Sequence, residues 1–267
     1  MPQPTLPPGS ADQLRRHGAI VLRGAVDPGP LSAEVVACLA DGVPADTAPR
    51  SSPTGNAFHY VPLMSRRSPV SLSLVAELGR LAAELLGRAA LPVRAKGTRY
   101  QGSTRWHRDA DGEVTSLAVM AYLDPLDGPS GALRVLPGSH RPPLRAAPPG
   151  LPGDDGEAGR TLATRPGDLV VMDEHLLHAS VGGGERRQWR VDFIADPRGP
   201  AEEAAVAAYL AGIFQVGWDG GYDVERYPTY GPDWLASGQP GVARLAELGA
   251  YRLAAAEEAA VSRPPRP

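Results

Sequence analysis

The sequence predicts a mainly β protein with flanking α-helices, and three observations support this fold class. Between residues 92 and 196, short apolar runs alternate with turns rich in Gly, Pro and Asp, which is typical of an antiparallel sandwich or barrel. Apolar residues at helical spacing occur before and after this region. The chain has 267 residues and no clear linker. We therefore expect one domain over residues 1–267, with a helical flank at about 11–90, a β core at about 92–196 and a helical, aromatic extension at about 200–260.

The N-terminal flank is predicted to combine helices with one strand. The segment ADQLRRHG (11–18) is amphipathic, and AIVLRGAV (19–26) is an apolar, strand-like run. A helical pattern follows the turn residues DPGP. Residues 46–70 are polar and rich in turn residues, so we expect a loop there. Residues 71–90 carry apolar side chains at helical spacing and predict the clearest helix of the chain.

Six short segments of the core region are predicted strands. They are VRAKGTRYQ, TSLAVMAYL, ALRVLPGSH, DLVVMDEH, LLHASV and QWRVDFIA. Residues 142–163 interrupt them with a stretch rich in Pro, Gly and Asp, typical of an inserted loop or lid. After residue 200, EEAAVAAYLAGIF and ARLAELGAYRLAAAEEAA are predicted helices. The aromatic, Gly-rich stretch at 217–234 between them is a candidate lid or dimer contact.

The composition excludes several classes of protein. The 27 basic and 30 acidic residues give a net charge of -3, which argues against nucleic-acid binding. The single cysteine, Cys38, excludes an internal disulfide and a cysteine-rich zinc site. No signal peptide is visible, and no apolar run is long enough to cross a membrane. We therefore expect a cytoplasmic monomer or homodimer that acts on a small molecule, in which a metal would be held by histidines and carboxylates.

The triplet His107-Arg108-Asp109 follows a predicted strand and is the first candidate for a metal site. Residues two apart on a strand point to the same side, so His107 and Asp109 can face one cavity. His178 lies much later, in a second strand-like segment. Two imidazoles and one carboxylate on one face of a metal form the facial triad of non-haem Fe(II) oxygenases, which leaves open positions. By itself an H-x-D triplet is weak evidence, because isolated histidines are more often packed or surface residues.

Arg190 is the candidate partner for a 2-oxo acid cosubstrate. Such a molecule chelates iron through its keto-carboxylate end, and its distal carboxylate then suits a bidentate arginine better than a lysine. Ser180 shares the face of the second histidine and can donate a hydroxyl hydrogen bond to the same carboxylate. The alternatives for Arg190 are a salt bridge on the face of Asp192 or a place on the surface. Arg186 and Arg187 compete for the role, but their position in the turn GGGERR predicts that they face solvent.

Four stretches of the chain together resemble the phytanoyl-CoA dioxygenase-like branch of the Fe(II)/2-oxoglutarate oxygenases. They are LRRHGAIVLRGAVDPGPL, WHRD, SGALRVLPGSH, and PGDLVVMDEHLLHAS followed by RVDF. Their order and spacing match the family over about residues 11–45 and 92–196. The resemblance implies a double-stranded β-helix (jelly-roll, cupin-like) core. The residues it implies at the site are His107, Asp109 and His178 as iron ligands, with Arg190 and Ser180 on the cosubstrate.

The family also uses polar contacts from the strand that precedes the H-x-D triplet. In this chain that strand ends in Arg99, Tyr100 and Gln101. Alternation places Arg99 and Gln101 on one face and Tyr100 on the other, so all three cannot point inward. Gln101 is the residue we expect to contact the cosubstrate.

Several other residues are candidates that we expect to stay outside the metal site. His175 competes as the third ligand, but is expected to be a loop residue or a neighbour of the ligands. His140 lies in the PGSH turn and is expected to be structural. Asp111 could replace the carboxylate ligand, but its spacing from the first histidine fits a strand poorly. Lys96, the only lysine, is a candidate for a cosubstrate or substrate contact, and the aromatic residues 58–60 could line the substrate entrance.

The resemblance implies an enzyme that uses Fe(II), 2-oxoglutarate and O₂ to oxidise an unactivated C–H bond of a small molecule, with release of succinate and CO₂. Hydroxylation in natural-product (antibiotic) metabolism is the expected outcome. The same iron chemistry can instead give oxidative cyclisation, epoxidation or desaturation of a sugar or other natural product. A catalytically silent jelly-roll that binds a metal or a small molecule is the alternative from another class. The complete triad together with Arg190 argues against that alternative.

Overall fold

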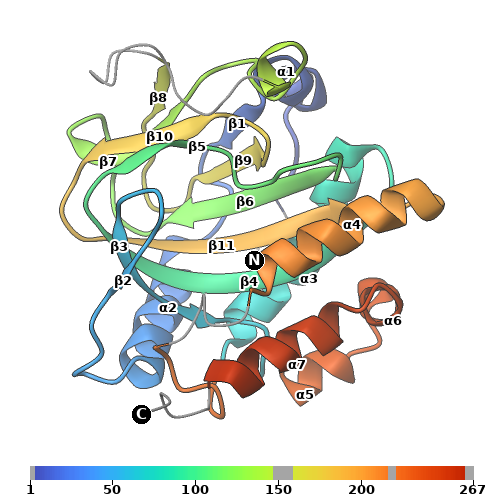
Figure 1. Ribbon diagram of the computed structural model, residues 1–267. Helices are drawn as coiled ribbons and strands as arrows, with labels where there is room; N and C mark the ends of the chain where they lie inside the picture. Colours follow the sequence, from blue (N-terminus) through green and yellow to red (C-terminus); the bar gives the residue numbers. More distant parts are fainter. Residues whose placement is uncertain (1–3, 147–158, 216–220, 262–267) are drawn as a thin grey trace.

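Two antiparallel β-sheets form the core of the protein in the computed structural model, which describes residues 4–146, 159–215 and 221–261 (Figure 1). Within these residues the larger sheet has seven strands and the smaller one four. In sheet order, the larger consists of β1 (Ala19–Leu22), β9 (Leu169–Asp173), β6 (Ser116–Tyr122), β11 (Arg186–Ala195), β4 (Ala90–Gln101), β3 (Ala57–Pro62) and β2 (Arg50–Ser51). The smaller consists of β5 (Thr104–His107), β10 (His178–Gly182), β7 (Ser130–Val135) and β8 (Arg160–Leu162). This arrangement confirms the predicted jelly-roll core with flanking helices.

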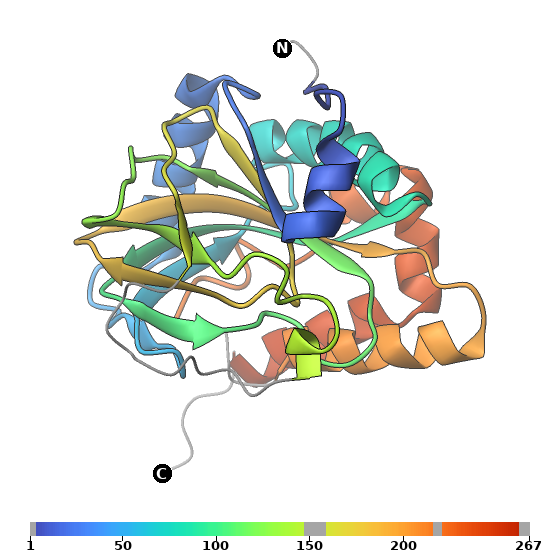
Figure 2. The ribbon, with the colours of Figure 1, turned by 90° about the horizontal axis from the view of Figure 1, so that it is seen from above.

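Helices pack against the larger sheet. The helices are α1 (Ser10–His17), α2 (Pro28–Gly42), α3 (Pro69–Leu86), α4 (Pro200–Ile213), α5 (Pro232–Leu235), α6 (Pro240–Glu247) and α7 (Ala250–Val261), with a 3-10 turn at Leu144–Ala146. α2, α3 and α6 contact β4, and α3 also contacts β11. Figure 2 shows the strands gathered toward one side of the molecule, with α3 (teal), α4 (orange) and α7 (red) toward the other. The helical flanks therefore cover the larger sheet, which forms one wall of the site described below.

β11 lies inside the larger sheet, between β6 and β4, and its side chains alternate between two environments. One set is fully buried in the main apolar core, and comprises Trp189, Val191 and Phe193. The Trp189 indole N–H donates a hydrogen bond to Ser71 Oγ of α3 at 2.8 Å, so this set faces the helices. The other set lines a cavity between the two sheets, and comprises Arg186, Gln188, Arg190 and Asp192.

α3 is held at its start by a carboxylate from α2. The first N–H groups of a helix have no partner within the helix. The Glu34 carboxylate accepts hydrogen bonds from the backbone N–H groups of Val70 and Ser71, each at 2.7 Å. Pro69 has no N–H to satisfy and suits the first helical position. At the other end, Gly87 stops the helix with a φ of 67°, a left-handed conformation that favours glycine. The predicted helix at 71–90 is confirmed with these bounds.

The loop predicted at 46–70 contains strand β3, which the sequence pattern did not reveal. Phe58 and Tyr60 point into the cavity, while His59 points the other way and contacts the Thr47 carbonyl oxygen at 3.0 Å. Three consecutive aromatic rings in a polar segment hide this alternation of inward and outward side chains. The strand forms because β4 offers it an edge to pair with, which is a contact between distant segments.

The C-terminal extension contains the predicted helices, but the second one is divided. α6 ends at Glu247 and α7 begins at Ala250, because Gly249 adopts a left-handed φ of 82°. Of the aromatic stretch at 217–234, residues 217–220 lie outside the described part. The described aromatic side chains of this stretch are buried in the main core: Tyr222, Tyr227, Tyr230 and Trp234. The Tyr230 hydroxyl donates to the Val93 carbonyl oxygen of β4, so this stretch packs against the sheet.

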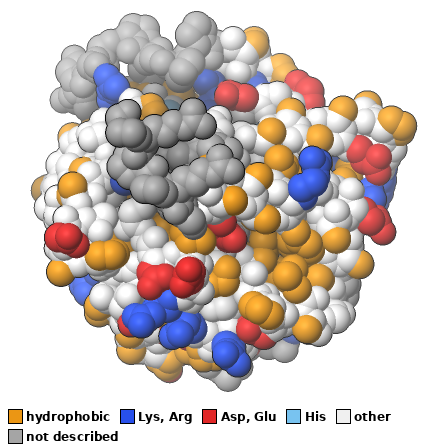
Figure 3. Space-filling view, turned by 60° about the horizontal axis from the view of Figure 1, so that its bottom comes forward, with side chains coloured by type: hydrophobic (Ala, Val, Ile, Leu, Met, Phe, Trp, Pro, Cys, Tyr) orange, Lys and Arg blue, Asp and Glu red, His pale blue; other side chains and the backbone are white. Residues whose placement is uncertain are grey.

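Most of the predicted insertion at 142–163 lies outside the described residues, which omit 147–158. Its last part forms β8, which pairs with β7 at the edge of the smaller sheet. The ends of the chain at 1–3 and 262–267 are also outside the described part. Among the described helices, no segment combines the length and the apolar character needed to cross a bilayer. On the face drawn in Figure 3, acidic and basic side chains are interspersed with hydrophobic ones, rather than gathered into a basic patch.

Asp168 fixes the turn that precedes β9. Its carboxylate accepts hydrogen bonds from the backbone N–H groups of Gly24 and Arg165, both at 3.0 Å, and pairs with Arg23 at 2.6 Å. Burial opposes the charged form, but the hydrogen bonds from these two backbone N–H groups, together with Arg23, hold the pKa of Asp168 below its usual value.

We expect Asp168→Ala to lower the free energy of unfolding at pH 7 by about 1–3 kcal/mol, because two backbone N–H groups lose their acceptor. A carboxylate with a lowered pKa stabilises the fold above its unfolded-state pKa, and this contribution is lost as the pH falls through its folded-state value. The difference between the variant and the wild type should therefore shrink below about pH 4. Urea unfolding of both proteins at pH 7 and below about pH 4 measures this difference in the free energy of unfolding. Asp12→Ala, which removes an exposed ion pair with Arg15, is the control, and an equal effect of both substitutions would contradict the prediction.

Candidate metal centre and cosubstrate site

Two neighbouring strands of the smaller sheet bring the predicted histidine ligands together. His107, at the end of β5, lies directly opposite His178, at the start of β10, and their ring centroids are 4.2 Å apart. The Nδ1 of His107 contacts the Arg105 carbonyl oxygen at 2.8 Å, and the Nδ1 of His178 contacts the Leu176 carbonyl oxygen at 2.9 Å. Since a carbonyl oxygen only accepts, each Nδ1 carries the proton, and each Nε2 presents its lone pair to the site.

Asp109 completes the triad from the turn that follows β5. Its backbone N–H donates to the Glu174 carbonyl oxygen at 2.9 Å, which fixes the turn against the loop between β9 and β10. Its Oδ1 lies 3.4 Å from His107 Nε2 and 3.5 Å from His178 Nε2. Adjacent ligands in an octahedral site, at about 2.1 Å from the metal, lie about 3 Å apart. The three ligand atoms lie within 4.8 Å of one another, so they could hold one metal ion, and the structure brings the three predicted ligands together.

The charges of Asp109 and His178 suit metal binding at neutral pH. Burial lowers the pKa of His178 to about 4, so this imidazole is neutral. Burial opposes the ionised form of Asp109, but the nearby Arg190 cation outweighs it and holds the pKa of Asp109 well below its usual value. A neutral imidazole and an ionised carboxylate are the forms that bind a metal.

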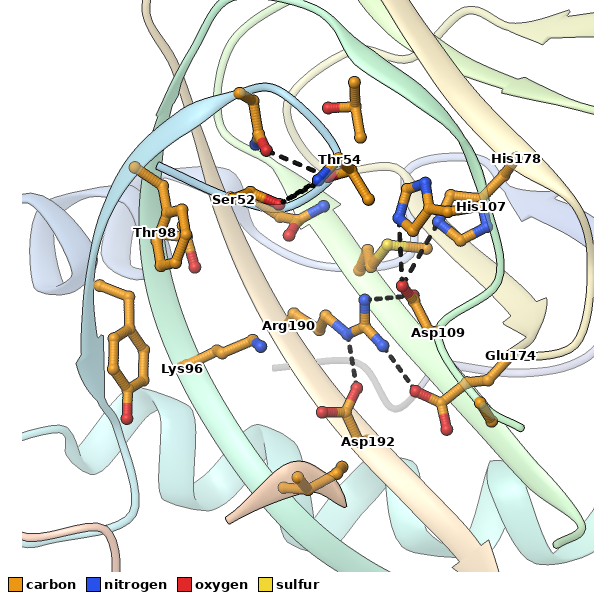
Figure 4. A pocket seen from close by; sticks show the side chains of 18 of the residues that line it. Ser52, Thr54, Lys96, Thr98, His107, Asp109, Glu174, His178, Arg190 and Asp192 are labelled. Atoms are coloured by element: carbon orange, nitrogen blue, oxygen red, sulfur yellow. Dashed lines mark hydrogen bonds and ion pairs between the residues drawn. The ribbon is translucent and has the colours of Figure 1, made fainter. Parts of the chain in front are cut away.

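Arg190 lies beside the triad and is enclosed by carboxylates (Figure 4). Its Nη1 donates to Asp109 Oδ2 at 2.7 Å and its Nη2 to Glu174 Oε1 at 2.6 Å, while its Nε donates to Asp192 Oδ1. The Tyr209 hydroxyl of α4 donates to the other Glu174 oxygen at 2.6 Å. Burial, reinforced by the nearby Asp192, raises the pKa of Glu174 to about 7, although Arg190 acts in the opposite direction. The salt bridge with Asp192 that the sequence offered as an alternative is present.

Arg186, and not Arg190, lies beside Ser180. Arg186 Nη2 donates to Ser180 Oγ at 2.7 Å, and its Nη1 donates to the Gly102 carbonyl oxygen at 2.8 Å. The guanidinium also lies over the Tyr100 ring, 5.6 Å from the centroid. The prediction that Arg186 faces solvent is wrong, since the residue is only 4% exposed. β11 begins at Arg186, so the turn GGGERR is shorter than expected and the side chain alternates inward. Arg187 behaves as predicted in part, because it is half-buried and pairs with Asp124.

The end of β4, where the cosubstrate contact was predicted, alternates as expected, but the face opposite to the predicted one points inward. Gln101 is exposed and does not line the cavity, whereas Tyr100 does. The reason is the register of β4 with β11, in which Tyr100 lies opposite Arg186. A single strand shows its alternation in the sequence, but only pairing with a neighbour decides which face is inward. Tyr100 and the neighbouring Tyr122 of β6 are cavity residues that the sequence reasoning missed.

The remaining candidates lie apart from the triad or at the edge of the cavity. His175 contacts Asp173 through Nδ1 at 3.1 Å and Arg145 through Nε2 at 3.0 Å, so it braces a loop. His140 contacts the Arg15 carbonyl oxygen at 3.1 Å, in agreement with a structural role. Asp111 lines the cavity but is exposed and is not part of the triad.

The cavity has a volume of about 650 Å³, which is in the range of small-molecule sites. The triad and Ser180 lie on the wall formed by the smaller sheet, and the inward side chains of β4 and β11 form the opposite wall. Phe58 and Tyr60 of β3 and Tyr209 and Ile213 of α4 line the rest. Figure 4 shows Lys96 of β4 pointing into this space, in agreement with its candidacy for a ligand contact.

Comparisons with known proteins give a partial match to one family and a shared fold. Residues 83–187 match the phytanoyl-CoA dioxygenase (PhyH) family. Curated proteins give no match. The structure is similar to that of AviO1 from Streptomyces viridochromogenes Tue57, at 22% identity and a TM-score of 0.53, over 73% of this chain and 98% of that chain.

Two proteins of nogalamycin biosynthesis are also similar in structure. One is the non-haem α-ketoglutarate-dependent epimerase SnoN, at 20% identity and a TM-score of 0.57, over 70% of this chain and 79% of that chain. The other is the carbocyclase SnoK, at 17% identity and a TM-score of 0.57, over 72% of this chain and 85% of that chain. At these identities the likenesses establish the fold alone. The stretch that matches the phytanoyl-CoA dioxygenase (PhyH) family, residues 83–187, includes His107, Asp109 and His178, the three residues that the structure brings together.

Proposed function

We propose that this protein oxidises an unactivated C–H bond of a small natural product, with 2-oxoglutarate and O₂ as cosubstrates, and that hydroxylation is the outcome. The observation that carries the proposal is a complete triad facing a cavity that also holds a buried arginine with neutral partners. Iron bound at the triad supplies the oxidation, coupled to conversion of 2-oxoglutarate to succinate and CO₂. The protein residues bind, orient and shield the reactants.

The distal carboxylate of 2-oxoglutarate is proposed to bind Arg186 and Ser180. Within the described residues, Arg186 donates to two neutral oxygens and to no carboxylate. A buried cation is costly unless an anion accompanies it, and a guanidinium fork matches a carboxylate. Ser180 is buried and lies two residues after the ligand His178 on β10, so both can contact the ends of one small molecule. Arg190, the residue expected from the sequence, is already paired with three carboxylates.

The substrate is proposed to occupy the part of the cavity lined by β3 and α4. Phe58 and Tyr60 offer aromatic faces there, and Lys96 offers a cation. SnoN has been solved in complex with Fe³⁺, α-ketoglutarate and nogalamycin RO, which supports a natural product of related size as substrate here. Since SnoN is an epimerase and SnoK a carbocyclase, the same fold serves outcomes other than hydroxylation. Oxidative cyclisation, epoxidation and desaturation are therefore the second candidates.

Product mass separates hydroxylation from cyclisation and desaturation, and the NMR spectrum of the product separates hydroxylation from epoxidation, which adds the same mass. Incubation with Fe(II), 2-oxoglutarate and a panel of natural products should give one succinate per substrate that gains one oxygen atom. A product that has lost two hydrogen atoms would identify cyclisation or desaturation instead. Metal binding with no succinate from any member of the panel, and none in the absence of substrate, would favour the silent binding protein.

The triad prediction is tested with His107→Ala. We expect this variant to bind Fe(II) more than about 100-fold more weakly and to form no succinate, because two ligands cannot hold the metal in place of three. Metal titration and succinate assay measure the two effects. His17→Ala, an exposed histidine of α1, is the matched control and should behave as the wild type. Full succinate formation by His107→Ala would disprove the triad.

The cosubstrate prediction is tested with Arg186→Gln. Loss of a hydrogen-bonded ion pair of about 1.5–3 kcal/mol should raise the KM for 2-oxoglutarate roughly 10- to 150-fold, with little change in Fe(II) affinity. Arg187→Gln, the adjacent arginine that pairs with Asp124, is the control. A raised KM in Arg190→Gln with an unchanged KM in Arg186→Gln would return the role to Arg190.

A further inference from the structure

We infer that Arg190 is a positioning residue that holds the outer oxygen of Asp109, so that this carboxylate binds the metal through one oxygen only. The inference rests on the proposed function, because it concerns the same metal centre. The inference assigns a role to Arg190, which does not bind the cosubstrate in the proposed function.

The two oxygens of Asp109 have different partners. Oδ1 faces both ligand imidazoles, at 3.4 Å from His107 and 3.5 Å from His178. Oδ2 points away from them and accepts a hydrogen bond from Arg190 Nη1 at 2.7 Å. A carboxylate that bound through both oxygens would occupy a fourth position on the metal. A facial triad has to leave three positions open for the cosubstrates, so a donor on Oδ2 preserves the reactive geometry.

Arg190 is itself fixed from three directions. Its three nitrogens each donate to a different carboxylate, those of Asp109, Glu174 and Asp192. The side chains of Glu174 and Asp192 are each 1% exposed, and that of Arg190 is 12% exposed. A planar guanidinium can serve three acceptors at once in a set geometry, whereas a lysine ammonium is a point charge on a flexible stem. The arrangement therefore requires arginine rather than positive charge alone.

Glu174 fixes Asp109 both directly, through the backbone, and indirectly, through Arg190. Its carbonyl oxygen accepts the backbone N–H groups of Asp109 at 2.9 Å and Ala110 at 3.1 Å, and its carboxylate orients Arg190 at 2.6 Å. The backbone and the side chain of the metal ligand are therefore both set by one residue of the loop before β10. The Tyr209 hydroxyl on the second Glu174 oxygen, at 2.6 Å, extends the same chain of contacts to α4.

Arg190 has a second cation opposite it on β4, so its charge needs the compensation that its three carboxylates provide. Lys96 of β4 lies directly across from Arg190 in the register of the sheet, and both residues line the cavity. Like charges at such a pair of positions destabilise a sheet. The three carboxylates around Arg190 offset this repulsion, and one of them is the metal ligand. A buried charge cluster of this kind is stabilising only when its geometry is complete, so loss of one member should affect the others.

The test uses Arg190→Lys, which keeps the charge and loses the fork, and Co(II) as a spectroscopic probe of the metal site. We expect Arg190→Lys to bind Co(II) about 10- to 100-fold more weakly than the wild type. We also expect a visible Co(II) spectrum of changed shape, because the coordination of Asp109 is no longer fixed. The double variant Arg190→Gln/Asp192→Asn, which removes one charge of each sign, should show the same changes if it folds as judged by circular dichroism. Arg187→Lys, on the same strand but paired with Asp124, is the control and should match the wild type in both readouts.

Wild-type Co(II) affinity and spectrum in both folded Arg190 variants would overturn the inference. So would a raised KM for 2-oxoglutarate in Arg190→Lys with unchanged Co(II) binding, since Arg190 would then be a cosubstrate contact. The proposed function fails on other measurements. It fails if the wild type binds Co(II) but forms no succinate, or if it binds Co(II) no better than His107→Ala, whatever residue stands at position 190.

Discussion

The alternation of side chains along β11 is the constraint on which both the core and the site depend. β11 pairs with β4 on one side and with β6 on the other, so its register is fixed from both edges. One face packs Trp189 and Phe193 into the core, and the other presents Arg186 and Arg190 to the cavity. Successive strand residues must point to opposite faces, so a shift of one residue would exchange the two sets. The packing of the indole against α3 therefore also sets the positions of the charged groups.

The parts of the structure that were predictable from the sequence are those that a local pattern determines. The triad follows from a histidine and an aspartate two residues apart at the end of a strand, and from a later histidine in a strand-like run. The strand-rich core and the long helix α3 also follow from periodicity within one segment. The family resemblance joined these local features into one site. His107 and Asp109 needed no knowledge of distant contacts, whereas His178 reaches them through the pairing of β10 with β5.

The features that the sequence did not decide depend on pairing between distant segments. Arg186 and Arg190 are four residues apart on one strand, so alternation directs both inward and cannot choose between them. The choice is made by their neighbours, since Ser180 of the other sheet meets Arg186, and Asp109 meets Arg190. The inward direction of Tyr100 likewise follows from its register with β11. β3 was missed for the same reason, because it forms against an edge that only the folded sheet provides.

The two arginines that β11 presents to the cavity differ in how far their charge is compensated. At the start of the strand, Arg186 has neutral oxygen partners and favours an anion, and Gln188 then provides a neutral spacer. Arg190 follows, already compensated beside the triad. In the proposed function, the distal carboxylate of the cosubstrate would lie toward the Arg186 end, because a compensated guanidinium offers an anion little. That orientation would leave the space toward β3 and α4 for the substrate. These elements come from the chain on either side of the strand-rich core, so on this proposal the core would fix the oxidation chemistry while the flanks would determine which carbon it reaches.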